Sequence, residues 1–256
     1  MTFVKAASAI PYTPYVAPEK DDTKRFMANY MASSMYKKRL ASQGIYSTPD
    51  IQSILNVPIN YNTKQDTQAT IVKNGGQIKN SININKNQLA DVKKDFNFPV
   101  SIDEAKAHEL SHVSRPLSQQ EQLLIAGKNK SDLGYGLFAQ YQTDKSLGSY
   151  QGQYDDYKTN GIDNSNDAYH DYRPNENKAD LDALRFLMQK KGIYDTSKRD
   201  MTIDDFNKAS QDPEIKNSLI FNRLIQQFKP KDIISLNNTV AMNNAASPQL
   251  SAAYMV

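Results

Sequence analysis

The segment HELSH, residues 108–112, places two histidines four positions apart. On an α-helix this spacing projects both imidazoles from one face, where they can hold a single cation. A helix is predicted here because residues 101–104, SIDE, have the form of a capping box, and Pro116 requires the helix to end shortly before it. The segment therefore predicts a metal-binding helix. Two histidines that merely decorate a helix surface are the alternative.

The composition restricts which residues can complete such a site. The chain has no cysteine and only three histidines, so a metal ion has to be held by His, Asp and Glu. A candidate third ligand is Glu176 in the segment NENKAD, residues 175–180, which begins a predicted helix with Pro174 in its first turn. Taken alone, this acidic pattern is typical of a solvated helix face.

Together, HELSH and NENKAD resemble the HExxH and NExx(A/S)D motifs of gluzincins, the thermolysin-like zinc peptidases. The resemblance implies that His108, His112 and Glu176 bind Zn²⁺ and that Asp180 accepts a hydrogen bond from a ligand histidine. It covers two short helices. The separation of His112 and Glu176, 176 − 112 = 64 positions, is longer than in thermolysin, which leaves the subfamily open.

Two imidazoles and one carboxylate leave a fourth position for water, whose pKa zinc lowers toward about 7. Glu109, about 100° around the helix from His108, is then the expected general base in the hydrolysis of a peptide or protein substrate. The predicted activity is that of a zinc metalloendopeptidase. His170 is the preferred candidate for the donor that stabilises the oxyanion. The alternative is that His170 is simply a solvated histidine in a polar loop. Three neighbours are candidates for the same role: Tyr169, Tyr172 and Arg173.

The predicted fold is α+β and predominantly helical, with a small antiparallel sheet, a zincin-like active-site helix and a following helix that carries the glutamate. Residues 69–73 and 77–84 flank Asn-Gly-Gly and predict a hairpin. Its edge can accept an extended peptide as an added strand, and a purely structural hairpin is an equal alternative. Helices are predicted at 22–40, 49–55, 88–95, 101–115, from 118, 174–192, 202–210, 213–228 and 231–242.

The chain divides into an extended, proline-containing N-terminal arm at 1–20, a metallopeptidase-like domain at 21–242 and a C-terminal tail at 243–256. A long insertion rich in Gly and Tyr, residues 127–172, interrupts the domain, and loops of this length are usually functional or mobile. Five of its tyrosines are candidates for a substrate or partner surface, with local packing as the alternative: Tyr135, Tyr141, Tyr150, Tyr154 and Tyr157.

A second function is predicted from the two terminal segments. Extended arms that become ordered against neighbouring subunits are typical of rings and collars in virions. The arms and the Asn- and Lys-rich composition resemble virion-associated proteins of tailed, crAss-like phages. The alternative function is therefore a structural ring or collar protein of a phage tail or portal, homo-oligomeric or bound to other virion subunits, in which the zinc site is retained without being catalytic.

Charge and hydropathy argue against two classes of partner. The formal net charge is only +3, without a basic stripe, which is unlike a nucleic-acid-binding protein. No run of about 18 apolar residues is present, and Lys5 interrupts the one candidate for a signal peptide, at residues 1–10. We therefore expect no nucleic acid and no membrane partner, and a location in the cytoplasm, or in the virion if the protein is phage-encoded.

Overall fold

The computed structural model describes residues 21–42, 51–62, 64–74, 77–96, 99–113, 119–130 and 174–240. Both terminal segments, on which the virion hypothesis rests, lie outside the described residues. So do the five tyrosines of the insertion, of which only residues 127–130 are described. None of the helices in the described part of the chain is long and apolar enough to span a membrane.

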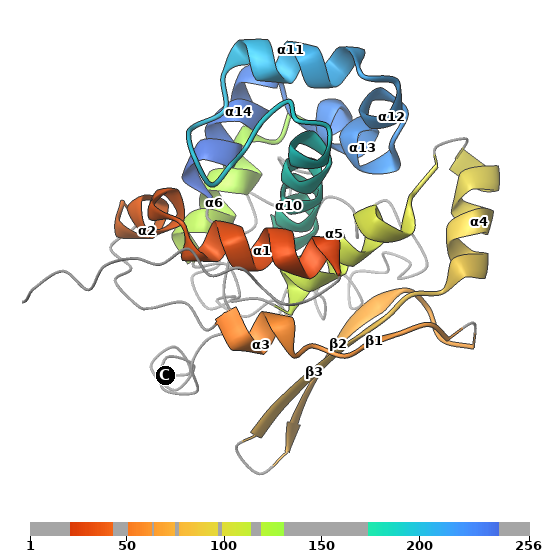
Figure 1. The fold of residues 1–256 in the computed structure, drawn as a ribbon. Helices are drawn as coiled ribbons and strands as arrows, with labels where there is room; N and C mark the ends of the chain where they lie inside the picture. The colour runs from red at the N-terminus through yellow and green to blue at the C-terminus, as the bar shows by residue number, and fades with distance from the viewer. Residues whose placement is uncertain are drawn as a thin grey trace, which may run out of the picture.

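The described part of the chain is predominantly helical with one small sheet, as predicted for an α+β fold (Figure 1). The helices are α1 (Asp22–Ala32), α2 (Ser34–Ala41), α3 (Ile51–Leu55), α4 (Lys86–Phe96), α5 (Ile102–His112), α6 (Gln119–Lys128), α10 (Pro174–Lys190), α11 (Ile203–Gln211), α12 (Pro213–Lys216), α13 (Leu219–Gln227) and α14 (Pro230–Thr239). The strands are β1 (Ile59–Asn60), β2 (Gln68–Asn74) and β3 (Gln77–Asn83).

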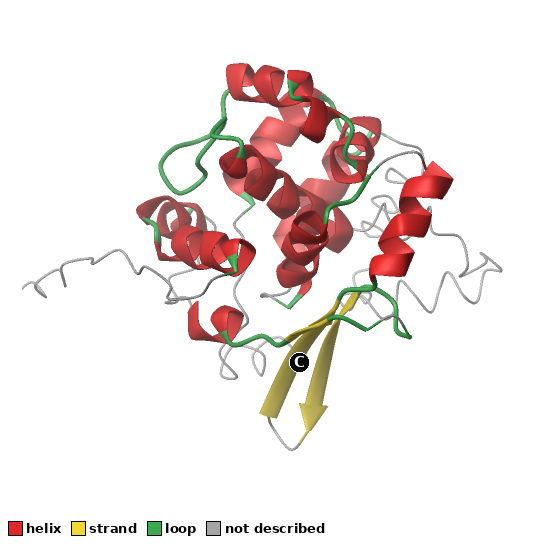
Figure 2. Ribbon diagram, turned by 45° about the vertical axis from the view of Figure 1, so that its right-hand side comes forward, coloured by secondary structure: helices red, strands yellow, loops and turns green. Residues whose placement is uncertain are grey.

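The sheet has the order β1-β3-β2 and is mixed. Strands β2 and β3 form the predicted antiparallel hairpin, which extends from one side of the helical body (Figures 1 and 2). The prediction of a purely antiparallel sheet was wrong, because β1 pairs in parallel with β3. A strand of two residues cannot show an alternating pattern, so its sequence gave no indication of this pairing.

Two predicted helices are each divided by a serine. The helix expected at 22–40 is broken at Ser33, whose Oγ accepts a hydrogen bond from the backbone N–H of Tyr36 at 3.1 Å. The helix expected at 213–228 is broken at Ser218, whose Oγ accepts from the N–H of Phe221 at 3.2 Å. In both cases the serine has extended backbone angles and caps a new helix, which lets the chain change direction.

Helix α10 lies at the centre of the helical body (Figure 1). It packs most extensively against α5, and α6, α12, α13 and α14 also contact it. Leu110 of α5 and Leu184 of α10 are fully buried in a hydrophobic cluster that also includes Phe26 of α1, Ile82 of β3 and Leu236 of α14. The core therefore fixes α5 and α10, the two helices that carry the predicted metal ligands, against each other.

Gly192 ends α10 with a left-handed backbone, φ +68°. The N–H of Ile193 reaches back to the carbonyl of Met188 at 2.9 Å, as in a helix C-cap that requires such a residue. Replacing Gly192 with alanine is expected to lower the free energy of unfolding by about 1 kcal/mol, through backbone strain. No atom lies within 4 Å of the added Cβ, so a steric clash does not contribute.

Urea unfolding measures this effect, and Gly192→Asn is its matched control. Asparagine tolerates the left-handed region better than alanine, so it should recover part of the lost stability. Equal midpoints for the wild type and Gly192→Ala would contradict the assignment of strain to this position.

Candidate metal centre

The local sequence determines where α5 begins. Ser101 Oγ accepts a hydrogen bond from the N–H of Glu104 at 3.1 Å, and Glu104 Oε2 accepts one from the N–H of Ser101 at 3.3 Å. This is the predicted capping box, and it holds the first turn of α5. From this start the helix runs through His108 to His112, which lie one turn apart on the same face.

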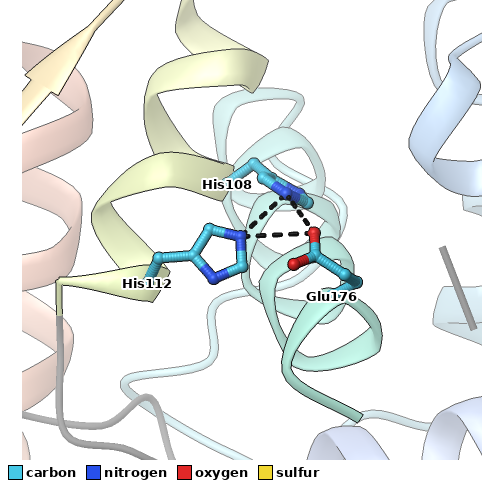
Figure 3. A group of neighbouring side chains, drawn as sticks. All are labelled: His108, His112 and Glu176. Carbon is cyan, nitrogen blue, oxygen red and sulfur yellow. Dashed lines mark hydrogen bonds and ion pairs between the residues drawn. The ribbon is translucent and has the colours of Figure 1, made fainter. Parts of the chain in front are cut away.

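Three predicted ligand atoms converge between α5 and α10 (Figure 3). His108 Nε2 lies 3.1 Å from His112 Nε2 and 3.1 Å from Glu176 Oε2, and the third side of the triangle, His112 Nε2 to Glu176 Oε2, is 3.3 Å. A tetrahedral ion with bonds of about 2.0–2.1 Å holds its ligand atoms about 3.3–3.4 Å apart. The triangle is thus close to the size that zinc requires.

The three side chains differ in exposure. His108 is 11% exposed and Glu176 is 7% exposed, whereas His112 is 22% exposed. Glu176 lies in the first turn of α10, a helix that is buried along nearly its whole length. The centre is therefore enclosed by protein on the side of His108 and Glu176 and is more open beside His112.

A buried carboxylate orients the first histidine. Asp180, which is fully buried one turn after Glu176, lies 2.9 Å from His108 Nδ1 through its Oδ1. A proton on Nδ1 directed at Asp180 leaves Nε2 to face the other two ligand atoms. The structure thus places Asp180 where the gluzincin resemblance implies a partner for a ligand histidine.

Asp180 is itself held by Arg223 of α13. Arg223 Nε donates a hydrogen bond to Asp180 Oδ2 at 2.9 Å, and its Nη2 donates to Oδ1. This two-point contact extends the centre from α5 and α10 to a third helix. Sequence reasoning missed Arg223, because it lies 223 − 180 = 43 positions beyond Asp180 in an ordinary amphipathic helix and has no spacing that points to the motif.

The charges of the centre shift the pKa values of His108, Glu176 and Asp180. Burial alone lowers the pKa of His108, but the hydrogen bonds and negative charges of Asp180 and Glu176 raise it to about 10. Burial raises the pKa of Glu176, but the two histidines hold it well below its usual range. Burial likewise raises the pKa of Asp180, and Arg223 with His108 lowers it. Without a metal ion, therefore, His108 is a protonated cation between two carboxylates at neutral pH.

A metal ion has to displace this proton. Zinc binding at pH 7 is therefore expected to release a proton from His108, and zinc affinity is expected to rise with pH until about pH 10. In the metal-free protein, the raised pKa stabilises the fold fully below the unfolded value of about 6.5, and this contribution is lost as the pH rises through about 10. Calorimetry in buffers with different ionisation enthalpies counts the released protons.

Asp180→Asn provides the control for proton release. It removes one of the two carboxylates that raise the pKa of His108, so the pH range in which zinc releases this proton should move downward. Zinc binding to the wild type at pH 7 without proton release would contradict the assignment of the charged state to His108.

Glu109 follows His108 on α5, is buried, and is not one of the three converging residues. Among the described residues, none donates a hydrogen bond to its carboxylate, and the residue as a whole is 8% exposed. The side chain is thus not committed to a structural contact in this part of the molecule. His170, the predicted oxyanion donor, lies outside the described residues, as do its three alternatives at positions 169, 172 and 173.

No protein-family model, curated protein or solved structure matches the chain. A functional proposal for this protein consequently depends on its own residues. The strongest observation is the convergence of His108, His112 and Glu176 from two helices that the core packs together.

Proposed function

We propose that the protein is a zinc-dependent metallopeptidase of the gluzincin type, in which His108, His112 and Glu176 hold the metal ion and Glu109 is the general base. The observation that carries the proposal is the triangle of two imidazole nitrogens and one carboxylate oxygen, with sides of 3.1, 3.1 and 3.3 Å. This triangle has the donor types and the size that suit zinc.

The donor set favours a catalytic zinc site over a structural one. Structural zinc sites are closed by four protein ligands and are rich in cysteine, whereas catalytic sites use three protein ligands, often two histidines and a glutamate. In the described part of the chain, three His or acidic residues converge here and no fourth joins them. When bound, zinc supplies a Lewis acid that polarises a carbonyl and lowers the pKa of a water molecule.

The remaining chemistry belongs to residues of the chain. Glu109 accepts a proton from water as the water oxygen bonds to the peptide carbonyl carbon, and it passes that proton to the amine that leaves when the C–N bond breaks. Asp180 and Arg223 keep His108 in one orientation throughout. The partner that this chemistry requires is a peptide or protein substrate.

Metal analysis and a cleavage assay test the proposal together. We expect the purified protein to contain zinc in near-equimolar amount and to cleave casein or members of a peptide library. Incubation with 1,10-phenanthroline should abolish cleavage, and added zinc should restore it. His112→Ala, purified in parallel, controls for contaminating peptidases because it removes one metal ligand. Protein that binds no zinc, or cleavage that is equal in His112→Ala, would overturn the proposal.

A further inference from the structure

A buried ionic cluster joins the same two helices that carry the ligands. Lys178 of α10 donates hydrogen bonds from Nζ to the carbonyl oxygen of Ser111 at 2.9 Å and to Ser111 Oγ at 2.8 Å. Ser111 Oγ in turn donates to Asp182 Oδ2 at 2.7 Å. The three residues are at most 3% exposed. Burying a lysine is costly unless it is paired and hydrogen-bonded, so this placement is specific.

Arg185 holds Asp182, the acidic member of this cluster, in place. This fully buried guanidinium donates from Nη1 to Asp182 Oδ1 and from Nε to Asn237 Oδ1 at 2.7 Å. Its Nη2 donates to the carbonyl oxygens of Asn237 and Val240, both at 2.6 Å. Asp182 is therefore fixed to the C-terminal end of α14, and it has little freedom to release Ser111.

The position of the cluster in the sequence links it to the metal centre. Ser111 immediately precedes His112, and Lys178 follows Glu176 by two residues. The contact between Lys178 and Ser111 therefore constrains the backbone that carries His112 relative to the backbone that carries Glu176. These are the two ligands whose atoms are 3.3 Å apart.

The two histidines are oriented by different means. Asp180 holds the ring of His108 through Nδ1. For His112, the polar side-chain contacts with the described residues are made by Nε2, which faces the other two ligand atoms, and the ring also meets that of His108 edge to face. Within that part of the chain, no side chain hydrogen-bonds to Nδ1 of His112 as Asp180 does to that of His108. Its placement depends on the backbone of the last turn of α5, where Lys178 binds the Ser111 carbonyl oxygen and where a positive charge also favours the end of a helix.

We propose that Lys178 is a positioning residue of the metal centre, which holds the Ser111–His112 end of α5 against α10 and so sets the distance between His112 and Glu176. The inference rests on the proposed zinc centre. It assigns to Lys178 a role in metal affinity and coordination geometry, beyond any contribution to the stability of the fold.

Lys178→Met tests the role, with Lys24→Met as the matched control. Lys24 is also a buried lysine, and its Nζ donates to the backbone carbonyl of Leu55 at 3.0 Å, but it lies on α1 and contacts no ligand. We expect Lys178→Met to lower the zinc affinity of the folded protein about 10- to 100-fold and to change the visible spectrum of bound Co²⁺. Lys24→Met should leave zinc affinity within about twofold of the wild type, even though it also removes a buried charge.

A chemical rescue separates positioning from general destabilisation. Because the chain contains no cysteine, Lys178→Cys introduces a unique thiol. Alkylation with 2-bromoethylamine in denaturant, followed by refolding, rebuilds a lysine-like side chain that ends in an ammonium group. Zinc affinity and the Co²⁺ spectrum should then return toward those of the wild type. Should Lys178→Met fail to fold, Ser111→Ala keeps the lysine and its carbonyl contact, and a smaller loss of affinity is expected.

The outcomes distinguish the two proposals. A wild-type protein that binds no zinc refutes the metallopeptidase proposal itself. If the wild type binds zinc and folded Lys178→Met has the same affinity and Co²⁺ spectrum, only the role of Lys178 is refuted. In the fallback case, wild-type affinity in Ser111→Ala refutes it as well. Equal losses of affinity in Lys178→Met and Lys24→Met would also refute the positioning role, because they would show that Lys178 contributes only to the stability of the fold.

Discussion

Replacing Glu176 with glutamine is expected to lower zinc affinity about 100- to 1,000-fold. Glutamine has nearly the same size, so it keeps the packing of α10, but it removes the negative charge between the two histidines. Oε2 of Glu176 lies 3.1 Å and 3.3 Å from their Nε2 atoms, and the side chain is buried. Loss of one partner from a buried charged contact costs about 3–5 kcal/mol, and the lower part of that range, at about 1.4 kcal/mol per tenfold, corresponds to this loss of affinity.

Competition with a chromophoric chelator measures this loss, and Glu104→Gln is the matched control. Glu104 is likewise a buried glutamate, on α5, but it is not among the converging ligands. Burial and the neighbouring Asp180 raise its pKa to about 7, so glutamine imitates a state that the residue already populates at neutral pH. Zinc affinity close to that of the wild type is expected for this variant. Equal losses in the two variants would attribute the effect to the fold and not to ligation.

The parts of the fold that were predicted correctly are those that local chemistry determines. The capping box at 101–104 begins α5, Pro174 lies in the first turn of α10, and Gly192 follows its end. In each case the hydrogen bonds involved join residues a few positions apart, so the sequence alone contains the information. The sequence Asn-Gly-Gly predicts the pairing of β2 with β3 for the same reason.

The parts that were missed depend on contacts between distant segments. Ser33 and Ser218 can each lie within a helix or begin a new one, and the choice depends on where the following helix packs. Strand β1 exists only because β3 offers hydrogen-bonding partners to residues 59–60. No local pattern contains this information, and single-sequence reasoning therefore extended both helices and omitted the strand.

The residues of the candidate site also fall into those that the sequence indicated and those that only tertiary contacts reveal. The spacing of His108 and His112 is local, and the motif resemblance pointed to Glu176 across 64 positions. Arg223 and Lys178 could not be found in this way, because charged residues on a helix ordinarily face solvent. Their importance arises only when α5, α10 and α13 meet, which buries Lys178 against Ser111 and brings Arg223 to Asp180.

Replacing Glu109 with glutamine is expected to lower kcat about 100- to 10,000-fold while zinc remains bound. Glutamine cannot accept the proton that water loses as it attacks a carbonyl, and general-base catalysis by a positioned side chain contributes a factor of this size. Glu109 is not one of the converging ligand atoms, and no described residue hydrogen-bonds to its carboxylate. The substitution therefore removes a chemical function without breaking a structural contact in the described part of the chain.

Steady-state kinetics and zinc content, measured on the same preparation, check this prediction. Because the base acts in the transition state, kcat and kcat/KM should fall together, with little change in KM. The comparison with Glu176→Gln is informative, since that variant should lose zinc and activity in parallel and should regain part of its activity at high zinc concentration. Added zinc should give no recovery in Glu109→Gln. Wild-type turnover in zinc-loaded Glu109→Gln would exclude this residue as the base, whereas loss of zinc would instead make it part of the metal-holding group.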